Sequence, residues 1–283
     1  MITVGKILKE SIETLRSANL KGAQLDARLI VAHGLKMTSQ QVFGYPEKQV
    51  NERELQCVRK LIFRRSQFEP LALITGKKEF WSLPFKVTSE TLIPRPDSET
   101  LIEAVLINHP DRKWPARILD LGTGSGCLLL ALLHEYQNAT GVGTDISKDA
   151  LKIAKFNCEN LGMGSRVDFI HMDWNNVMPS MEQFDIVICN PPYIAEKDRN
   201  RISCDVVGFE PNIALFAGED GLREYKAILS LLAETKNLTY SVFFEVGFNQ
   251  ANDVSKLLKN AGLRNISIYP DLSGIGRCVA AKM

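Results

Sequence analysis

The sequence has 283 residues, of which 45% are hydrophobic and 24% are charged, proportions that are typical of a soluble globular protein. This length allows one large domain or two modest ones and excludes a chain too short to bury a core. The formal net charge of +1 excludes an overall electrostatic field that would hold the protein on nucleic acid or on an acidic membrane.

The first 75 residues have the spacing of amphipathic helices. Apolar side chains recur at steps of three and four from Val4 to Leu15, which places them on one helical stripe. We expect Gly22 to end this first helix and Gly34 to close a second one. The sequence therefore predicts an N-terminal helical domain over residues 1–75.

A third long helix is predicted after Asn51. The Asn51 side chain can cap the free amides of this helix while Glu54, three residues on, reaches back as in a capping box. A basic face of a helix is either a solvated surface or a docking surface for an acidic or RNA-bound partner, and the sequence leaves both interpretations open. This face carries Arg53, Arg59, Lys60, Arg64 and Arg65.

After the helical domain the pattern changes, first to a β-hairpin connector over residues 76–98 and then to a domain over residues 99–283. Predicted strands and helices follow one another in this domain, which indicates an α/β fold with a mostly parallel sheet and helices on both faces. The strands are expected at residues 116–122, 139–145, 166–173, 184–190, 238–247, 264–270 and 276–283, and the helices at 126–136, 147–162, 221–235 and 249–262.

A glycine-rich turn follows the first of these strands, which ends near Asp120. Glycines let the backbone adopt positive φ and approach a ligand closely, and the next helix offers free amides. A dinucleotide site is disfavoured because Cys127 or Leu129 occupies the third glycine position of its fingerprint. The pattern instead resembles the first motif of class I S-adenosylmethionine (SAM)-dependent methyltransferases. The residues of this glycine loop are Gly122, Thr123, Gly124, Ser125 and Gly126.

The next two strands also end in polar residues. Asp145 lies about twenty residues after the glycines, where a carboxylate can accept both ribose hydroxyls of a nucleoside. Asp173 and Trp174 lie where methyltransferases of this class hold adenine, through an amino contact and a stacking surface. Two other interpretations stay open: Asp145 as a helix N-cap and Trp174 as an ordinary core residue.

The fourth strand ends in Asn190, followed by two prolines and Tyr193. Prolines have no N–H group, so this loop accepts hydrogen bonds rather than donating them. The Asn190 side-chain oxygen and the Pro191 carbonyl can hold both hydrogens of a planar –NH2 group, while Tyr193 supplies a wall for a flat substrate. The segment is similar to the motif of amino-methyltransferases that act on adenine N6, guanine N2 or glutamine N5. The alternative interpretation is a merely rigid loop after a strand, without a chemical role. The residues of this loop are Asn190, Pro191, Pro192 and Tyr193.

The cysteines and histidines show no CxxC, HxxxH or HExxH spacing, so we expect no metal site. Reduced core cysteines, the absence of an apolar leader and the lack of any apolar segment near 18 residues are typical of a cytoplasmic protein without membrane contact. The cysteines are Cys57, Cys127, Cys158, Cys189, Cys204 and Cys278.

Several separated blocks together resemble one family. The blocks EPLALITGKKEFWSLPFKVTSETLIPRPDSE, ILDLGTGSG, NPPYI, GFEPNIALFAGEDGLREYKAI and FFEVGFNQ follow one another from Glu69 onward. In that order they are similar to the HemK/PrmC family of peptide chain release factor glutamine methyltransferases. The resemblance implies methyl transfer from SAM, with S-adenosylhomocysteine as product, to N5 of the glutamine in the GGQ motif of class I release factors.

Carried onto this chain, the resemblance implies that Gly122 to Gly126, Asp145, Asp173, Trp174 and Asn190 bind the cofactor. It implies that Asn190, Pro191, Pro192 and Tyr193 form the glutamine site. Arg95 and Pro96 resemble the connector beside the active site, although a hinge with surface charge remains possible. Glu210 and Pro211 are expected to order a loop near the substrate, and the N-terminal domain to recognise the release factor. We expect a monomer that makes no direct contact with nucleic acid.

Two departures and two alternatives accompany this assignment. Phe68 replaces the usual glycine before Glu-Pro, and Ile275 with Gly276 replaces a charged pair near the C-terminus. The first alternative is an N6-adenine or N2-guanine methyltransferase of DNA or RNA, which would need a flipped base and a basic recognition region. The second alternative is a module that binds SAM or a ribosomal partner without catalysis.

Overall fold

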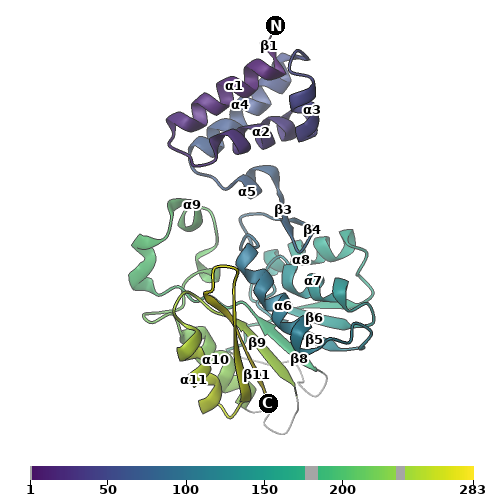
Figure 1. Ribbon diagram of the computed structural model, residues 1–283, viewed down its shortest axis with the longest axis vertical. Helices are drawn as coiled ribbons and strands as arrows, with labels where there is room; N and C mark the ends of the chain where they lie inside the picture. Colours follow the sequence, from purple (N-terminus) through teal and green to yellow (C-terminus); the bar gives the residue numbers. More distant parts are fainter. Residues whose placement is uncertain (1, 176–183, 234–239) are drawn as a thin grey trace. The chain divides into compact units, whose positions relative to one another are not determined.

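The structure, a computed structural model, describes residues 2–175, 184–233 and 240–283. The predicted helix end at 234–235 and strand start at 238–239 lie outside these residues. By its contacts the chain divides into two compact units (Figure 1). The first unit is Met1–Lys77 with Ser203–Phe209, and the second is Lys78–Ile202 with Glu210–Met283.

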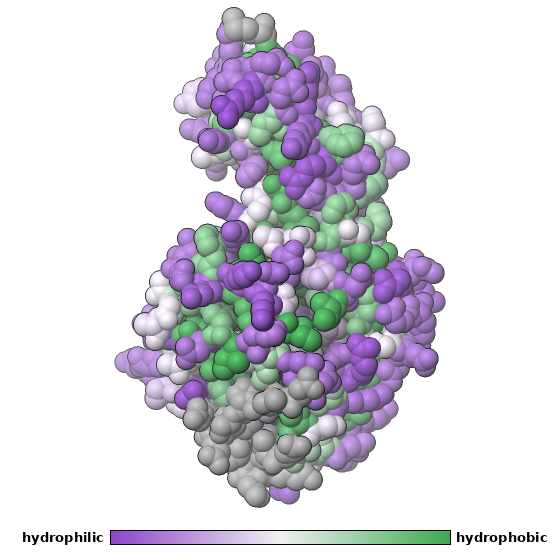
Figure 2. Space-filling model, turned by 180° about the vertical axis from the view of Figure 1, so that it is seen from behind, coloured by the Kyte–Doolittle hydropathy of each residue, from purple (hydrophilic) through white to green (hydrophobic). Residues whose placement is uncertain are grey.

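The first unit is a small helical bundle. Its apolar core includes the fully buried side chains of Leu15, Ile30 and Val58, one from each of the three long helices. Its outer surface is mainly hydrophilic (Figure 2), as expected for helices that each bury one stripe. The elements are β1 (Ile2–Thr3), α1 (Val4–Ser17), α2 (Ala23–Gly34), α3 (Ser39–Gly44), β2 (Gln49–Val50), α4 (Glu52–Ser66), α5 (Leu71–Thr75) and α9 (Cys204–Val207).

The helix ends in this unit confirm one expectation and correct another. The capping box before α4 is present, since Asn51 Oδ1 accepts from the Glu54 amide at 2.9 Å and Glu54 Oε2 accepts from the Asn51 amide at 3.0 Å. Gly22 does not end the first helix, because α1 stops at Ser17. Gly22 instead precedes α2 with φ of 82°, a conformation that a residue with a side chain adopts at a cost.

The basic face of α4 is partly neutralised within the same unit. Arg65 Nε donates to Asp26 Oδ2 at 2.8 Å, and both side chains are largely buried. Arg64 forms a two-pronged ion pair with Glu69. These arginines therefore stabilise the bundle, and a docking role for this face would fall on its other, more exposed cations.

The second unit is built on a seven-stranded sheet in the order β10-β11-β9-β8-β5-β6-β7. Strands β9, β8, β5, β6 and β7 run parallel to one another, whereas β11 is antiparallel to both β9 and β10. This arrangement confirms the class I methyltransferase fold and its mostly parallel sheet. The strands are β5 (Arg117–Leu121), β6 (Thr140–Asp145), β7 (Val167–His171), β8 (Ile186–Cys189), β9 (Ser241–Glu245), β10 (Arg264–Pro270) and β11 (Gly276–Lys282).

Helices cover both faces of this sheet (Figure 1). Ile118 of β5 packs into one core cluster with α6 and α7, and its neighbour Leu119 packs into the opposite cluster with α10 and α11. Successive strand residues point to opposite faces, so adjacent apolar residues of one strand contribute to two apolar cores. The helices are α6 (Glu99–Asn108), α7 (Cys127–Glu135), α8 (Lys148–Asn160), α10 (Arg223–Leu232) and α11 (Ala251–Asn260).

The predicted hairpin connector is also present, as the antiparallel pair β3 (Lys77–Phe80) and β4 (Leu83–Lys86). Helix α6 follows it and was not predicted, because its sequence is apolar on most sides and carries no side-chain N-cap. Among the residues that the structure describes, the unit also has the short 3-10 helices η1 (Pro96–Ser98), η3 (Glu196–Arg201) and η4 (Asn212–Ala214).

The cysteines are only partly the core residues expected from the sequence. Cys158, Cys189 and Cys278 are buried, but Cys57 and Cys204 are exposed. Across the described ranges, no three His, Cys, Asp or Glu side chains come together as metal ligands. Within the same ranges no helix combines the length and apolar character needed to cross a membrane.

Candidate active site

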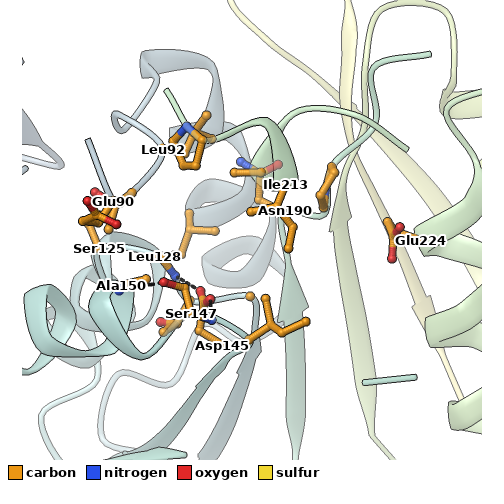
Figure 3. Close-up of a pocket in the computed structure, with 18 of the residues that line it drawn as sticks. Glu90, Leu92, Ser125, Leu128, Asp145, Ser147, Ala150, Asn190, Ile213 and Glu224 are labelled. Carbon is orange, nitrogen blue, oxygen red and sulfur yellow. Dashed lines mark hydrogen bonds between the residues drawn. The ribbon is translucent and has the colours of Figure 1, made fainter. Parts of the chain in front are cut away.

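A cavity of about 450 Å³ lies at the carboxyl ends of the parallel strands (Figure 3). This volume lies in the range of small-molecule sites. The segments that follow β5, β6, β7 and β8 contribute to its wall, as expected for an open α/β sheet. Of the site residues predicted from the sequence, those that line the cavity are Arg95, Gly122, Thr123, Gly124, Ser125, Asp145, Asp173, Trp174, Asn190 and Pro192.

The glycine loop approaches its surroundings closely. A Cβ atom on Gly122 would lie 3.0 Å from Cζ3 of Trp174, and the φ of 74° at Gly122 further favours glycine. Thr123 turns inward, where its hydroxyl donates to Asp120 Oδ2 at 2.6 Å. Gly126 does not line the cavity but forms the left-handed N-cap of α7, whose first amides begin beside the loop.

Asp145 connects the glycine loop to the next strand. Its Oδ2 accepts from the Gly124 amide at 2.9 Å and its Oδ1 accepts from the Ser147 amide at 2.8 Å. Burial raises the pKa of Asp145, and these two N–H groups oppose the rise. The N-cap of α8 is Ser147, which accepts from the Ala150 amide at 3.1 Å, so the interpretation of Asp145 as that N-cap is wrong.

Asp173 and Trp174 follow β7 and line the cavity together with Asp145. Asp173 Oδ1 accepts from the backbone and side-chain nitrogens of Asn175 at 2.9 and 2.8 Å. The Trp174 indole N–H donates to Glu224 Oε2 at 3.0 Å. Trp174 also packs against one core cluster, so the cavity-wall and core interpretations both describe it.

Asp120 lies beneath the glycine loop as a buried carboxyl group. Burial raises the pKa of Asp120 to about 7, the Thr123 hydroxyl opposes this rise, and the Asp145 carboxylate adds to it. Asp120 Oδ1 has no hydrogen-bond partner among the described residues. The group is therefore largely protonated below neutral pH in the folded protein.

The loop that begins at Asn190 enters the cavity from β8. Asn190 and Pro192 line the cavity, whereas Pro191 and Tyr193 are not among the lining residues. The Tyr193 ring packs against the second core cluster, and its hydroxyl donates to Glu245 Oε1 at 3.3 Å. The predicted role of Tyr193 as a substrate wall stays a prediction, and its described contacts are those of an anchor for the loop.

Arg95 is held at the cavity by a carboxylate that is distant in sequence. Glu210 is buried, forms an ion pair with Arg95 and accepts from the Ile93 amide at 2.9 Å. Glu210 therefore fixes the segment that carries Arg95, and Pro211 after it lines the cavity. This geometry favours an ordered wall over a solvent-exposed hinge.

The polar residues of this region that were not predicted from the sequence include Glu224, Glu245 and Gln250. Glu224 lines the cavity beside Trp174, and the other two contact Tyr193. Glu245 had one available signal, because it ends a buried strand at the same sheet edge as Asp120 and Asp145. Glu224 bonds Trp174 across 50 residues and Gln250 bonds Tyr193 across 57 residues, and no local pattern marks these two contacts.

Comparison with known proteins gives two domain matches. Residues 6–76 match the PrmC N-terminal domain, and residues 115–234 match a methyltransferase domain. Among solved structures, the hMettl16 catalytic domain in complex with MAT2A 3′UTR hairpin 6 covers 82% of this chain and 86% of its own at 18% identity, with a TM-score of 0.56. At that identity the likeness shows the fold alone.

The curated relatives extend over nearly the whole chain. A bifunctional methyltransferase of Rickettsia bellii is 34% identical over 98% of this chain, which spans only 54% of that relative. Release factor glutamine methyltransferases of Bradyrhizobium diazoefficiens and Coxiella burnetii are 37% and 36% identical, over 95% and 100% of this chain and 91% and 99% of their own lengths. The resemblance seen in the sequence is thereby confirmed, and this chain belongs to the family of release factor glutamine methyltransferases.

Proposed function

We propose that this protein methylates N5 of the glutamine in the GGQ motif of class I peptide chain release factors, using SAM and releasing S-adenosylhomocysteine. The observation that carries the proposal is that Asn190 opens into the same cavity as the glycine loop and Asp145. A planar –NH2 group and a cofactor can therefore meet in one space. Family membership favours glutamine over a nucleobase as the owner of that group.

The residues on one side of the cavity fit the cofactor. The Asp145 carboxylate already accepts two backbone N–H groups, and its four lone-pair sites leave capacity for ribose hydroxyls. Gly122 brings no side chain between the loop and Trp174, whose ring offers an apolar surface to adenine. The bound cofactor would supply a methyl group on a positively charged sulfur, and these residues would orient it.

The residues on the other side fit the acceptor. The Asn190 side-chain oxygen and the Pro191 carbonyl would accept the two hydrogens of the glutamine amide, which aims its nitrogen at the methyl group. Holding both hydrogens in this geometry would pull the nitrogen lone pair out of conjugation with the carbonyl as the bond from nitrogen to the methyl carbon forms and the bond from that carbon to sulfur breaks. The methylated nitrogen then becomes strongly acidic and releases one proton to water, which restores a neutral amide without a dedicated base.

The N-terminal helical unit is proposed to recognise a part of the release factor distant from its glutamine. Binding energy from such remote contacts would align a weak nucleophile at the reacting centre. In this proposal Arg53 and Lys60 of α4 supply the docking charge, because both are exposed. The enzyme would act as a monomer without direct contact to nucleic acid, and its acceptor implies a cytoplasmic location.

The proposal is tested by methyl transfer from labelled SAM to three acceptors side by side. These are a class I release factor, the same factor with its GGQ glutamine changed to alanine, and duplex DNA. Label on the intact factor alone would support both the reaction and the acceptor atom. Label on DNA, or equal label on the alanine variant, would contradict the proposed acceptor while leaving the –NH2 site in place.

A further inference from the structure

The segment after β9 contacts Tyr193 at two separate points. Glu245, the last residue of β9, accepts from the Tyr193 hydroxyl through Oε1 at 3.3 Å. Gln250, five residues on, donates from Nε2 to the Tyr193 backbone carbonyl at 3.0 Å. One short segment thus binds both the side chain and the main chain of the residue that ends the 190–193 loop.

Two glycines make these contacts possible. A Cβ atom on Gly247 would lie 2.9 Å from Cδ2 of the Tyr193 ring and 2.7 Å from Oε1 of Gln250. A Cβ atom on Gly221 would lie 2.3 Å from the Tyr193 carbonyl oxygen. Such distances are below van der Waals contact, so a side chain at either position would displace Tyr193 or Gln250.

The Gln250 side chain is itself fixed in place. Its Oε1 accepts from the Gly247 amide at 3.0 Å, and its Nε2 also donates to the Gly221 carbonyl at 3.3 Å. Both N–H groups of the Gln250 amide are therefore used as donors, and its oxygen accepts one hydrogen bond. These three bonds set the orientation of the amide. At Glu245 the strand end is secured in the same way, because Tyr225 donates its hydroxyl to the Glu245 carbonyl at 2.7 Å.

The other end of the 190–193 loop is held by the sheet. Cys189 pairs with Leu121 of β5 on one side and with Phe244 of β9 on the other. Between Cys189 and Tyr193 stand Asn190 and two prolines, whose rings fix φ near about −65°. With both ends held and little torsional freedom between them, the positions of the Asn190 side chain and the Pro191 carbonyl depend on where Tyr193 is placed.

We propose that Glu245, Gly247 and Gln250 form a Tyr193 clamp, a set of positioning residues that place Asn190 and the Pro191 carbonyl for methyl transfer. This inference rests on the proposed function of the 190–193 loop. The clamp residues do not line the cavity themselves, so they act through Tyr193. A displacement of the loop by a fraction of an ångström would misalign the acceptor nitrogen without removing any group that binds it.

The clamp predicts a split between kinetic constants. Replacing Gln250 with alanine should lower kcat about 10- to 100-fold, because alignment of the nitrogen is lost, while the Kd for SAM changes less than about twofold. Glu245→Gln keeps an oxygen for the Tyr193 hydroxyl and should cost less than Glu245→Ala. The matched control is Asn252→Ala, which removes an exposed amide from the same helix and should change nothing.

A double-mutant comparison tests the pathway through Tyr193. If Glu245 acts through the hydroxyl of Tyr193, then Glu245→Ala added to Tyr193→Phe should cost little more than either substitution alone. Additive losses in kcat would overturn the proposed coupling. An unchanged kcat in Gln250→Ala, or an equal loss of SAM affinity, would overturn the positioning role.

A readout without turnover separates this inference from the proposed function. Hydrogen exchange of the peptide spanning residues 190–196 should speed up in Gln250→Ala and stay as in the wild type in Asn252→Ala. Unchanged exchange would contradict the clamp, whatever the acceptor is. If the wild type labels duplex DNA and not the release factor, the proposed function fails, and the same kcat comparison on DNA still decides the clamp.

Discussion

The two sides of the cavity are built in different ways. On the cofactor side the contacts of the glycine loop are close in sequence: Thr123 bonds Asp120 three residues away, and Asp145 of the adjacent strand bonds Gly124, 21 residues away. Trp174 on the same side has a distant partner, Glu224, 50 residues away. On the acceptor side the 190–193 loop and the Arg95 segment depend on partners 52 to 117 residues away. The glycine loop and Asp145 thus belong to two adjacent strands and the helix between them, whereas the 190–193 loop and the Arg95 segment take their positions only once the whole unit has folded.

The largest expected effect separates the two sides directly. Asn190→Ala removes a proposed acceptor of the substrate –NH2 group, and we expect kcat to fall about 10²- to 10³-fold. The Kd for SAM should stay within about threefold, because the glycine loop and Asp145 are untouched. Single-turnover transfer and calorimetric titration with SAM measure the two quantities.

The control for this variant is Asn260→Ala, which truncates an exposed amide at the end of α11. Equal losses of SAM affinity and kcat in Asn190→Ala would show that the two sides are one interdependent site. No loss of either quantity would contradict an acceptor role for Asn190 and favour a binding module.

The same division explains what the sequence could predict. The glycine loop, the Asp145 position and the Asn51 capping box were found because each is defined by neighbours within a few residues or one strand–helix repeat. Helix α6 was missed because an all-round apolar helix has no 3.6-residue periodicity to detect. Gln250 was missed because it precedes α11 as an ordinary amide, and its contact with Tyr193 joins residues that lie 57 positions apart.

The family resemblance added what local patterns could not. It predicted that Arg95 and Glu210 lie near the substrate. The structure shows an ion pair between them, a hydrogen bond from the Ile93 amide to Glu210, and Arg95 at the cavity wall. The resemblance assigned Tyr193 to the glutamine site without the contacts that hold it. Burial by tertiary packing was the least predictable property, since Cys57 and Cys204 were expected in the core and are nonetheless exposed.

The next effect concerns the buried carboxyl on the cofactor side. The pKa of Asp120 is raised to about 7 by burial, whereas the ordinary value is 3.8. Between these two pH values the unfolded chain has released the proton and the folded chain still holds it. The free energy of unfolding therefore falls as pH rises through this window and becomes level above it.

Replacing Asp120 with asparagine removes this titration. The stability of the wild type relative to Asp120→Asn should fall by on the order of 3 kcal/mol between pH 4 and 7, at about 1.4 kcal/mol per pKa unit. Urea unfolding of both proteins at pH 4.5, 6, 7 and 8 checks the difference, in which other titrating groups cancel. A difference that stays level from pH 4.5 to 8 would mean that Asp120 is already ionised in the folded protein at pH 4.5.

A smaller effect is expected from Asp145→Asn. Asparagine keeps one oxygen but turns an NH2 group toward the amides of Gly124 or Ser147, which also donate. We expect SAM affinity to fall about 10- to 100-fold, corresponding to about 1.4 to 2.8 kcal/mol. At saturating SAM kcat should change less than about threefold, the reverse of the Asn190→Ala pattern.

The control for Asp145→Asn is Asp149→Asn, which neutralises an exposed carboxylate paired with Lys152 on α8. It should leave SAM affinity unchanged, because exposed ion pairs contribute little. Equal losses of affinity in both variants would point to a general electrostatic effect on the cofactor rather than to the bonds of Asp145.

The smallest effect tests the long-range contact that holds Arg95. Removing one member of a fully buried ion pair costs about 3–5 kcal/mol, because the other charge stays buried and unpaired. Here the Glu210 side chain is 1% exposed but that of Arg95 is 34% exposed, so water can solvate the freed guanidinium. Glu210→Gln also retains a carbonyl oxygen for the Ile93 amide, and its cost should therefore be mild.

We expect Glu210→Gln to lower kcat/KM about three- to tenfold, with no change in SAM affinity, because only the cavity wall that carries Arg95 loosens. Arg95→Lys should have a similar effect, since an ammonium group keeps the charge but not the planar fork. Because both substitutions disrupt the same ion pair, the combined variant should lose no more than either single one. Weaker SAM binding in Glu210→Gln would instead mean that the contact between Arg95 and Glu210, 115 positions apart, also affects the cofactor side of the cavity.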